Sequence, residues 1–362
     1  MRDMRAEDAY AGAVKSTLKL LPLGLACFAA PVPSLAAGTA APVIVSAPAP
    51  YPATGSVERL DPALDALLSR SVNMEKLAEG FSWSEGPVWQ PREHRLIFSD
   101  VPRNTAYQWN EGAGVTVFLQ PSGYTGLVPG QNLGEGSNGL TLDRDGRLLL
   151  CQHGDRRISH LNDDGKTFTT VVDRFEGKRF SSPNDLCVDR HGNIYFTDPP
   201  YGLGQVGVRE IDFSGVYRRA TDGTISLLNR ELERPNGIAL SPDEKTLYVS
   251  NTDEKRPVIL AIPLQADGAA GTSRVFFDTT PLWVPGRPGP LDGMKVDVHG
   301  NVWATGPGGI LIISPAGKHL GSLLTGRATA NCCFGGPDGS VLYITSGNTL
   351  CRIQTKTKGN GL

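Results

Sequence analysis

Short runs of β-forming residues separated by polar turns dominate the chain from about residue 80 onward. One unit recurs six times: an apolar run, a turn often written Asp-Gly or His-Gly, and a second apolar run. Alternating β-formers on both sides of such a turn predict a β-hairpin for each copy. The six copies begin at Val88, Leu140, Leu186, Ile238, Met294 and Cys332.

The spacing of these hairpins predicts the architecture. Their turn residues lie 39 to 56 residues apart, and they are Glu93, Asp145, His191, Asp243, His299 and Asp338. Each interval holds about four strands, and a period of this length is typical of propellers. Four-stranded units arranged around an axis hide the sheet edges that an open array would expose, so we predict an all-β, six-bladed β-propeller. The alternative, a pair of β-sandwich domains, does not explain one hairpin motif repeated along the chain.

The N-terminal part of the chain differs from the repeats. Basic residues precede an apolar run over residues 20–30, and small residues follow it, which is the pattern of a secretory signal peptide. We assign residues 1–37 to this signal, which predicts a secreted or periplasmic protein. Residues 38–57 are rich in Ala and Pro and predict an extended tether. Residues 58–362 form the propeller domain, which begins with a short helical segment between Leu60 and Leu77.

Composition narrows the range of partners. The chain has 35 basic and 37 acidic residues and no basic block beyond its N-terminus, so nucleic acid is not expected. The apolar run of the signal is too short and too often broken by proline to span a bilayer, so we expect no membrane span in the mature protein. Five cysteines remain after Cys27 is removed with the signal, so at least one thiol stays unpaired within the chain. A small molecule is the expected partner, and the oligomeric state stays open.

The repeat also places a polar residue at an equivalent point of every unit. Seven residues before the turn, or eight in the first unit, stand Glu85, Asn138, Asn184, Asn236, Asp292 and Asn331. The innermost strands of a propeller begin beside its tunnel, so we expect these side chains to form a ring at one mouth. Carboxylate and amide oxygens suit Ca²⁺, which takes roughly six to eight of them. The alternative is that Asn-Gly pairs only supply left-handed backbone at strand entry, which leaves two tunnel carboxylates unexplained.

Four segments point together to a known family. They are SEGPVW from Ser84, SSPNDLCVDRHGNIYFTDPPYG from Ser181, RPNGIALSPDEKTLYVSN from Arg234 and LDGMKVDVHGNVW from Leu291. From about Leu60 to Ile353 the chain resembles the gluconolactonase, regucalcin and luciferin-regenerating-enzyme family, most closely its bacterial gluconolactonases. The resemblance implies a six-bladed propeller with one catalytic divalent metal, held by Glu85, Asn184, Asn236 and Asp292. The chain departs from regucalcin-like members at Ser182, where they carry an arginine that holds the sugar acid.

These observations predict a metal-dependent hydrolase that opens a sugar lactone, as gluconolactonase does. A metal ion polarises a carbonyl and activates water, and we expect Asp292 to accept the proton of that water, with Glu85 as the other candidate base. Oxygen ligands favour Ca²⁺ over Zn²⁺, with Mg²⁺ and Mn²⁺ as further candidates. Substrate contacts are expected from Asn138, His153, Asp198 and Tyr201. The alternatives are a metal-dependent arylesterase or phosphotriesterase, and a non-catalytic propeller that binds sugar or calcium.

Overall fold

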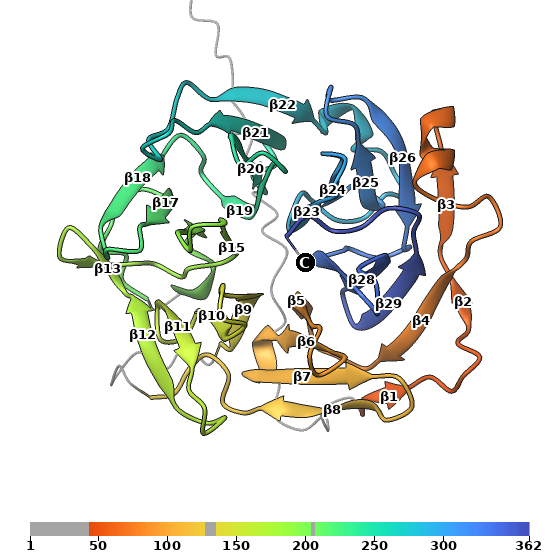
Figure 1. The fold of residues 1–362 in the computed structure, drawn as a ribbon, viewed down its shortest axis with the longest axis horizontal. Coiled ribbons are helices and arrows are strands. Elements are labelled where there is room, and N and C mark those ends of the chain that lie inside the picture. The colour runs from red at the N-terminus through yellow and green to blue at the C-terminus, as the bar shows by residue number, and fades with distance from the viewer. Residues whose placement is uncertain (1–42, 127–134, 204–206, 362) are drawn as a thin grey trace, which may run out of the picture. The chain divides into compact units, whose positions relative to one another are not determined.

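The computed structural model describes residues 43–126, 135–203 and 207–361, so the predicted signal peptide over residues 1–37 lies outside the described residues. Six antiparallel sheets surround a central axis, which confirms the predicted six-bladed β-propeller (Figure 1). In each blade the first strand lies innermost and the later strands lie further out. The helices of the described residues are short 3-10 helices, and none has the length and apolar character needed to cross a bilayer. They are η1 (Pro62–Ala66), η2 (Val101–Arg103), η3 (Tyr201–Leu203) and η4 (Thr280–Leu282).

The first four blades are each built from four consecutive strands. Blade 1 comprises β5 (Ser84–Gln90), β6 (Arg95–Asp100), β7 (Thr105–Asn110) and β8 (Gly114–Leu119). Blade 2 comprises β9 (Ser137–Leu142), β10 (Leu148–Gln152), β11 (Arg157–Leu161) and β12 (Phe168–Val172). A small hairpin of β13 (Arg174–Phe175) and β14 (Lys178–Arg179) follows. Blade 3 comprises β15 (Leu186–Val188), β16 (Ile194–Asp198), β17 (Gly215–Arg219) and β18 (Ile225–Asn229). Blade 4 comprises β19 (Pro235–Leu240), β20 (Thr246–Asn251), β21 (Val258–Pro263) and β22 (Arg274–Asp278).

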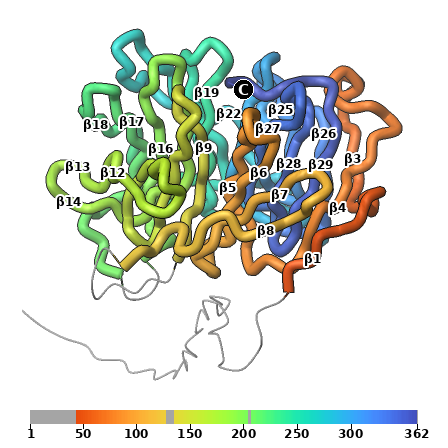
Figure 2. Tube along the Cα trace, turned by 60° about the horizontal axis from the view of Figure 1, so that its bottom comes forward, coloured from red at the N-terminus to blue at the C-terminus, as the bar shows by residue number. Residues whose placement is uncertain are grey.

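The last two blades are completed by the N-terminal segment. Blade 5 comprises β23 (Met294–Val296), β24 (Val302–Gly306), β25 (Gly309–Ile313), β26 (His319–Leu324) and, on its outer side, β3 (Ser56–Arg59). Blade 6 comprises β27 (Asn331–Gly335), β28 (Val341–Ser346), β29 (Thr349–Gln354) and β4 (Met74–Glu79). Two short strands, β1 (Val45–Ser46) and β2 (Ala53–Thr54), pair with β4. Figure 2 shows the orange N-terminal strands beside the blue C-terminal ones, so both ends of the described chain close the ring together.

The N-terminal segment differs from the expected tether and helix. The described part of the predicted tether, residues 43–57, includes strands paired with the propeller rather than a free linker. The helical segment expected after Leu60 is reduced to the five-residue helix η1. Leu64, Leu67 and Leu68, whose spacing suggested a helix, are buried in the core cluster between blades 5 and 6. Their apolar character therefore reflects packing against the sheets and not an amphipathic helix.

The hydrophobic core is divided among the interfaces between neighbouring blades. Six clusters of buried apolar side chains each join strands of two adjacent blades. Between blades 6 and 1, the rings of Trp89 and Tyr343 stack with centroids 5.4 Å apart and an interplanar angle of 9°. Full burial of a large apolar side chain contributes about 1.5–3 kcal/mol. Blade 1 therefore packs on blade 6 as directly as on its neighbour in the chain, which holds the central tunnel in a closed ring.

Candidate active site

The ring of polar residues predicted from the repeat lies at one mouth of the tunnel. Four of its members stand at the first or second residue of an innermost strand, and two stand two residues before one. Five of them are buried, and Asp292 is half-buried. The Nδ2 atom of Asn331 lies 3.2 Å from Oε2 of Glu85, which joins blades 6 and 1 across the ring. The six residues thus stand at equivalent places near the start of the innermost strands.

Glycines behind the ring residues let neighbouring blades approach one another closely. Glycine follows four of the six ring residues. A Cβ atom on Gly237 would lie 2.3 Å from the carbonyl oxygen of Asp292, and one on Gly293 would lie 2.0 Å from Cγ of Asn331. Real Cβ atoms do not approach other atoms so closely. The Asn-Gly and Asp-Gly pairs of the motifs are thus explained by this packing, with the glycine needed for contact between blades.

The close approach at Gly237 gives a first prediction. Gly237→Ala should push the backbone at Asp292 outward, and overpacking of this kind costs about 1–3 kcal/mol. We expect a lower melting temperature and a loss of catalytic activity that is larger than the fraction of unfolded protein explains. Gly271→Ala is the matched control, because its new Cβ would lie 3.3 Å from the nearest atom, a carbon of Pro263. Equal melting temperatures for the two variants would contradict this account of the ring.

Three amide oxygens of the ring lack hydrogen-bond donors. The Oδ1 atoms of Asn138, Asn184 and Asn236 are buried and have no partner within the described part of the chain. The Nδ2 atom of Asn236 donates to Oγ1 of Thr252 at 3.0 Å, which fixes the orientation of this amide. Buried acceptors without a partner are rare in proteins and need an explanation. The described residues hold no cluster of three His, Cys, Asp or Glu side chains arranged for a metal, so a cation here requires these amide oxygens.

The carboxylates of the ring repel one another. Burial raises the pKa of Glu85 to about 7, and the carboxylate of Asp185 adds to the rise. Burial also raises the pKa of Asp292, and the nearby carboxylate of Glu85 is the next cause. Buried like charges are costly unless a cation or a set of donors compensates them. Together with the unpartnered amide oxygens, these carboxylates form a donor set suited to a hard divalent cation.

Asn331 has a different role from the other ring amides. Its Oδ1 atom accepts the backbone N–H of Cys332 at 2.9 Å and lies 3.5 Å from Nζ of Lys295. Its Nδ2 atom donates to Glu85 at 3.2 Å and to Oδ2 of Asp185 at 3.3 Å. The oxygen of Asn331 is therefore engaged by donors, and its N–H groups hold two carboxylates in place. This residue orients the ring instead of offering an oxygen to a cation.

Two charged residues of this site, Asp185 and Lys295, were missed by the sequence analysis. Asp185 is buried and accepts the backbone N–H of Leu186 at 2.9 Å in addition to the bond from Asn331. Burial lowers the pKa of Lys295, but the carboxylate of Asp185 and other neighbours together outweigh it and raise the pKa above its ordinary value. The signal was present in the motifs, because Asp185 stands where four other units have glycine.

Asp198, predicted to contact substrate, lies behind the ring. Its side chain is fully buried, and its two oxygens accept the backbone N–H groups of Ser181 at 2.9 Å and Ser182 at 2.7 Å. Asp100 makes the same contacts with the loop before β5, through Ser82 and Trp83. Asp198 therefore fixes the loop that carries Asn184, and both oxygens are already engaged by the backbone.

The buried position of Asp198 gives a prediction on pH. Burial raises the pKa of this carboxyl to about 6, from an ordinary value of 3.8. Because the folded pKa is the higher one, the associated stability is fully present below about pH 4 and is lost as pH rises through about 6. Asp198→Asn cannot titrate, so the melting temperature of the wild type should fall relative to that of the variant across this window. Parallel melting curves from about pH 4 to 7 would contradict the assignment.

His153 and Tyr201 lie at the same mouth. The Nδ1 atom of His153 is 3.1 Å from Oε2 of Glu135, and its Nε2 atom is buried without a partner among the described residues. The hydroxyl of Tyr201 is near Thr252, Asn236 and Asp292, and burial raises its pKa to about 12. This hydroxyl is buried beside the ring without a hydrogen-bond partner among the described residues. The paired Nδ1 atom of His153 leaves the opposite nitrogen available for a ligand.

The fold and the site together define a class: a six-bladed β-propeller whose polar residues converge at one mouth of its tunnel. Residues 83–348 match the family model described as SMP-30/Gluconolactonase/LRE-like region, so the chain belongs to this family. It is 41% identical over 313 residues to a gluconolactonase of Zymomonas mobilis subsp. mobilis, covering 84% of this chain and 87% of that protein. It is 28% identical over 267 residues to a pentonolactonase of Haloferax volcanii, covering 72% and 80%. The solved structure of a gluconolactonase from Xanthomonas campestris superposes with a TM-score of 0.73 at 33% identity, covering 84% and 97%.

Proposed function

We propose that this protein hydrolyses a sugar lactone with the help of one divalent cation, for which calcium is favoured, bound at the polar ring. The reaction class rests on the relatives, since the gluconolactonase of Zymomonas mobilis aligns with 84% of the chain. The chain is accordingly a lactone hydrolase. The single observation that carries the metal is the set of three buried amide oxygens without donors beside two carboxylates.

The residues present fit such a cation. Glu85, Asn184, Asn236 and Asp292 would hold it, and the unpartnered oxygen of Asn138 offers a fifth donor. Two carboxylates and neutral amides balance the charge of a divalent ion, and oxygen donors favour Ca²⁺ or Mg²⁺ over Zn²⁺. Bound there, the ion would supply Lewis-acid polarisation of the lactone carbonyl and a lowered pKa for water.

The protein groups divide the remaining work of lactone opening. Asp292 is half-buried and lies near the hydroxyl of Tyr201, which supports its carboxylate as the acceptor of the proton of the attacking water. Glu85 is less suited to this role, because its Oε2 atom already accepts the backbone N–H of Gly86 at 2.5 Å and the amide of Asn331 at 3.2 Å. When the C–O bond of the lactone breaks, the leaving oxygen of the substrate needs a proton, which the protonated Asp292 can return. Glu85 therefore contributes its negative charge to binding the cation and does not transfer the proton.

The wall of the mouth supplies groups for a polyhydroxylated substrate. The hydroxyl of Tyr201 reaches the ring next to Asn236, and Nε2 of His153 is free to bond a hydroxyl because Glu135 holds Nδ1. Sites built to bond hydroxyl groups discriminate strongly against analogues that lack them. We expect this wall to select a sugar lactone over a simple ester.

The experiment that tests the function is hydrolysis of glucono-δ-lactone by the purified protein before and after chelation, with calcium, magnesium, manganese and zinc added back separately. Phenyl acetate and an organophosphate are assayed in parallel. We expect lactone turnover that stops on chelation and returns with calcium. Turnover that survives complete chelation would refute the metal, and turnover of only the ester or the organophosphate would replace the lactone with that substrate class. Metal binding without any turnover would leave a non-catalytic propeller.

A further inference from the structure

The tunnel has a second chamber at the end away from the ring. This far cavity has a volume of about 430 Å³ and is lined by the later residues of the innermost strands, by hairpin turns and by the C-terminal residues 359–361. None of the six ring residues lines it. A volume of this size falls within the range of small-molecule sites, roughly 300–1,000 Å³. The far cavity is therefore large enough for a ligand of its own.

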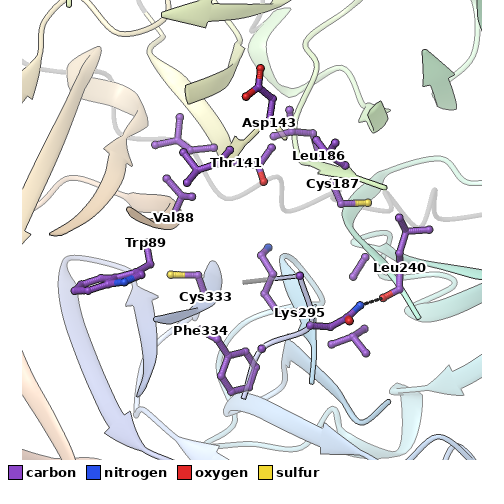
Figure 3. A pocket seen from close by; sticks show the side chains of 18 of the residues that line it. Val88, Trp89, Thr141, Asp143, Leu186, Cys187, Leu240, Lys295, Cys333 and Phe334 are labelled. Atoms are coloured by element: carbon purple, nitrogen blue, oxygen red, sulfur yellow. Dashed lines mark hydrogen bonds between the residues drawn. The ribbon is translucent and has the colours of Figure 1, made fainter. Parts of the chain in front are cut away.

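The walls of the far cavity are mainly apolar, with a single lysine among them. Figure 3 shows the side chain of Lys295 at the centre of the labelled residues, between the sulfur atoms of Cys333 and Cys187. Leu140, Leu240 and other aliphatic side chains of the inner strands complete the wall. The five cysteines of the described chain form no disulfide, so both thiols remain small apolar surfaces here. An ammonium group in such surroundings is a strong attractor for an anion.

The hydrogen bonds of Lys295 leave capacity for a further partner. Its Nζ atom donates to the carbonyl of Met294 at 3.0 Å and lies 3.5 Å from Oδ1 of Asn331, at the outer limit of a bond. An ammonium group has three donors. At least one N–H of Lys295 is thus without an acceptor among the described residues. The contact with Asn331 also places this ammonium at the boundary between the far cavity and the ring.

The charges at the opening of the far cavity favour an anion as well. Both acidic residues of its lining are already paired, Asp143 with Arg147 at 2.8 Å and Glu244 with Arg190 at 2.7 Å. Arg92 and Arg144 are exposed and form no ion pair with any described residue. Unpaired arginines around an opening raise the local concentration of anions. The lining is therefore positive at the rim and at the deep end, where the carboxylate of Asp185 lies outside the lining and offsets part of the charge of Lys295.

We propose that the far cavity binds an amphipathic organic monocarboxylate, with its carboxylate on Nζ of Lys295 and its apolar body against the side chains of the inner strands. A single ammonium group within an apolar wall matches one monoanionic head group. A phosphate dianion would need several charged donors at one point, and Lys295 is the single charged donor of the lining away from the exposed rim. The far cavity contains none of the six ring residues, although Lys295 also contacts Asn331 of the ring, and the inference does not depend on the lactonase reaction.

Calorimetric titration of the full chain with octanoate tests this proposal, with octanamide as the uncharged probe of the same length. We expect octanoate to bind at least about tenfold more tightly than octanamide, and to bind equally well with chelator or with calcium. Lys295→Met keeps the length of the side chain and should weaken octanoate binding about tenfold or more, without changing that of octanamide. The double variant Arg92→Gln/Arg144→Gln should weaken it about two- to fivefold.

The rim variant protects the test against a failure of Lys295→Met to fold, because both arginines are exposed. Arg70→Gln, at an exposed arginine that is not part of the lining, is the matched control and should bind octanoate as the wild type does. Equal affinity for octanoate and octanamide, or octanoate binding that disappears on chelation, would overturn the proposal. So would unchanged octanoate binding in the rim variant, or no heat at about 5 mM octanoate.

Discussion

Asp292→Ala should lower kcat/KM for lactone hydrolysis by about a thousandfold or more while the propeller stays folded. The side chain lies near Tyr201 and Glu85, and the proposed mechanism uses it both as a ligand of the cation and as the acceptor of the water's proton. Its loss removes both contributions from one position. The measurement is steady-state hydrolysis of glucono-δ-lactone, with the melting temperature recorded on the same preparation.

Two further variants serve as a control and as a test that separates the two proposed roles of Asp292. Asp163→Ala replaces an exposed aspartate and should leave activity unchanged. Asp292→Asn keeps an oxygen donor for the cation but loses the base, so it should retain calcium binding and still lose most of the turnover. Activity close to that of the wild type in Asp292→Ala would refute the role of this residue. Full activity in Asp292→Asn alone would restrict Asp292 to holding the cation and leave Glu85 as the base.

Glu85→Gln should be more stable than the wild type without metal, and it should lose that advantage when calcium is bound. Without metal, the wild type carries the buried carboxylates of Glu85, Asp185 and Asp292 together, and each raises the cost of the others. Removing one charge relieves this repulsion, so the chelated variant should melt above the chelated wild type. With calcium at 100 times its Kd, the wild type should gain about 2.7 kcal/mol in free energy of unfolding. The variant should gain less than half of that, because it binds the ion more weakly.

Differential scanning calorimetry of both proteins, with chelator and with a series of calcium concentrations, measures how the difference in stability between them changes with calcium. Glu244→Gln is the control, since its carboxylate belongs to a pair with Arg190 outside the ring. That variant should show the same calcium-dependent gain as the wild type. An equal gain in Glu85→Gln and the wild type would show that Glu85 does not hold calcium. A chelated variant less stable than the chelated wild type would show that the carboxylates do not repel one another as described.

The parts of the molecule that obey the repeat were predictable from the sequence. A hairpin turn fixes the register of its strands, so a residue at a constant distance before each turn must reach an equivalent place in every blade. The repeat alone therefore predicts equivalent positions for Glu85, Asn138 and Asn236. The family motifs then separated the four expected metal ligands from the other two members of the ring.

Two charged residues of the site stand at positions that break the repeat, and the repeat therefore did not predict them. Asp185 stands where glycine follows Glu85 and Asn138, and Lys295 stands where corresponding strands have Val88, Thr141 and Ala239. A charge at a position that is otherwise small or apolar marks a specialised contact. The orientation of Asn331 followed from neither rule, because it depends on donors from Lys295 and Cys332 in three dimensions.

The N-terminal strands and the role of Asp198 could not be predicted by pattern alone. Three prolines interrupt residues 43–57 and obscure a strand pattern, and the strands there pair with the edges that β4 and β26 offer. Asp198 ends its strand as a substrate-binding residue would, but neighbouring N–H groups capture both oxygens. Contacts with residues distant in the sequence therefore determine both the N-terminal strands and the role of Asp198.

The closure of the ring by β3 and β4 has a consequence for the synthesis of the protein. These strands precede blade 1 in the chain, whereas their partners β26 and β29 belong to the last two blades. Glu85 lies in blade 1 and Asp292 in blade 5, so the ring that joins them forms only after the final blade is complete. A chain that lacks these strands therefore has an incomplete propeller and an incomplete ring, so the order of synthesis and the order of assembly differ.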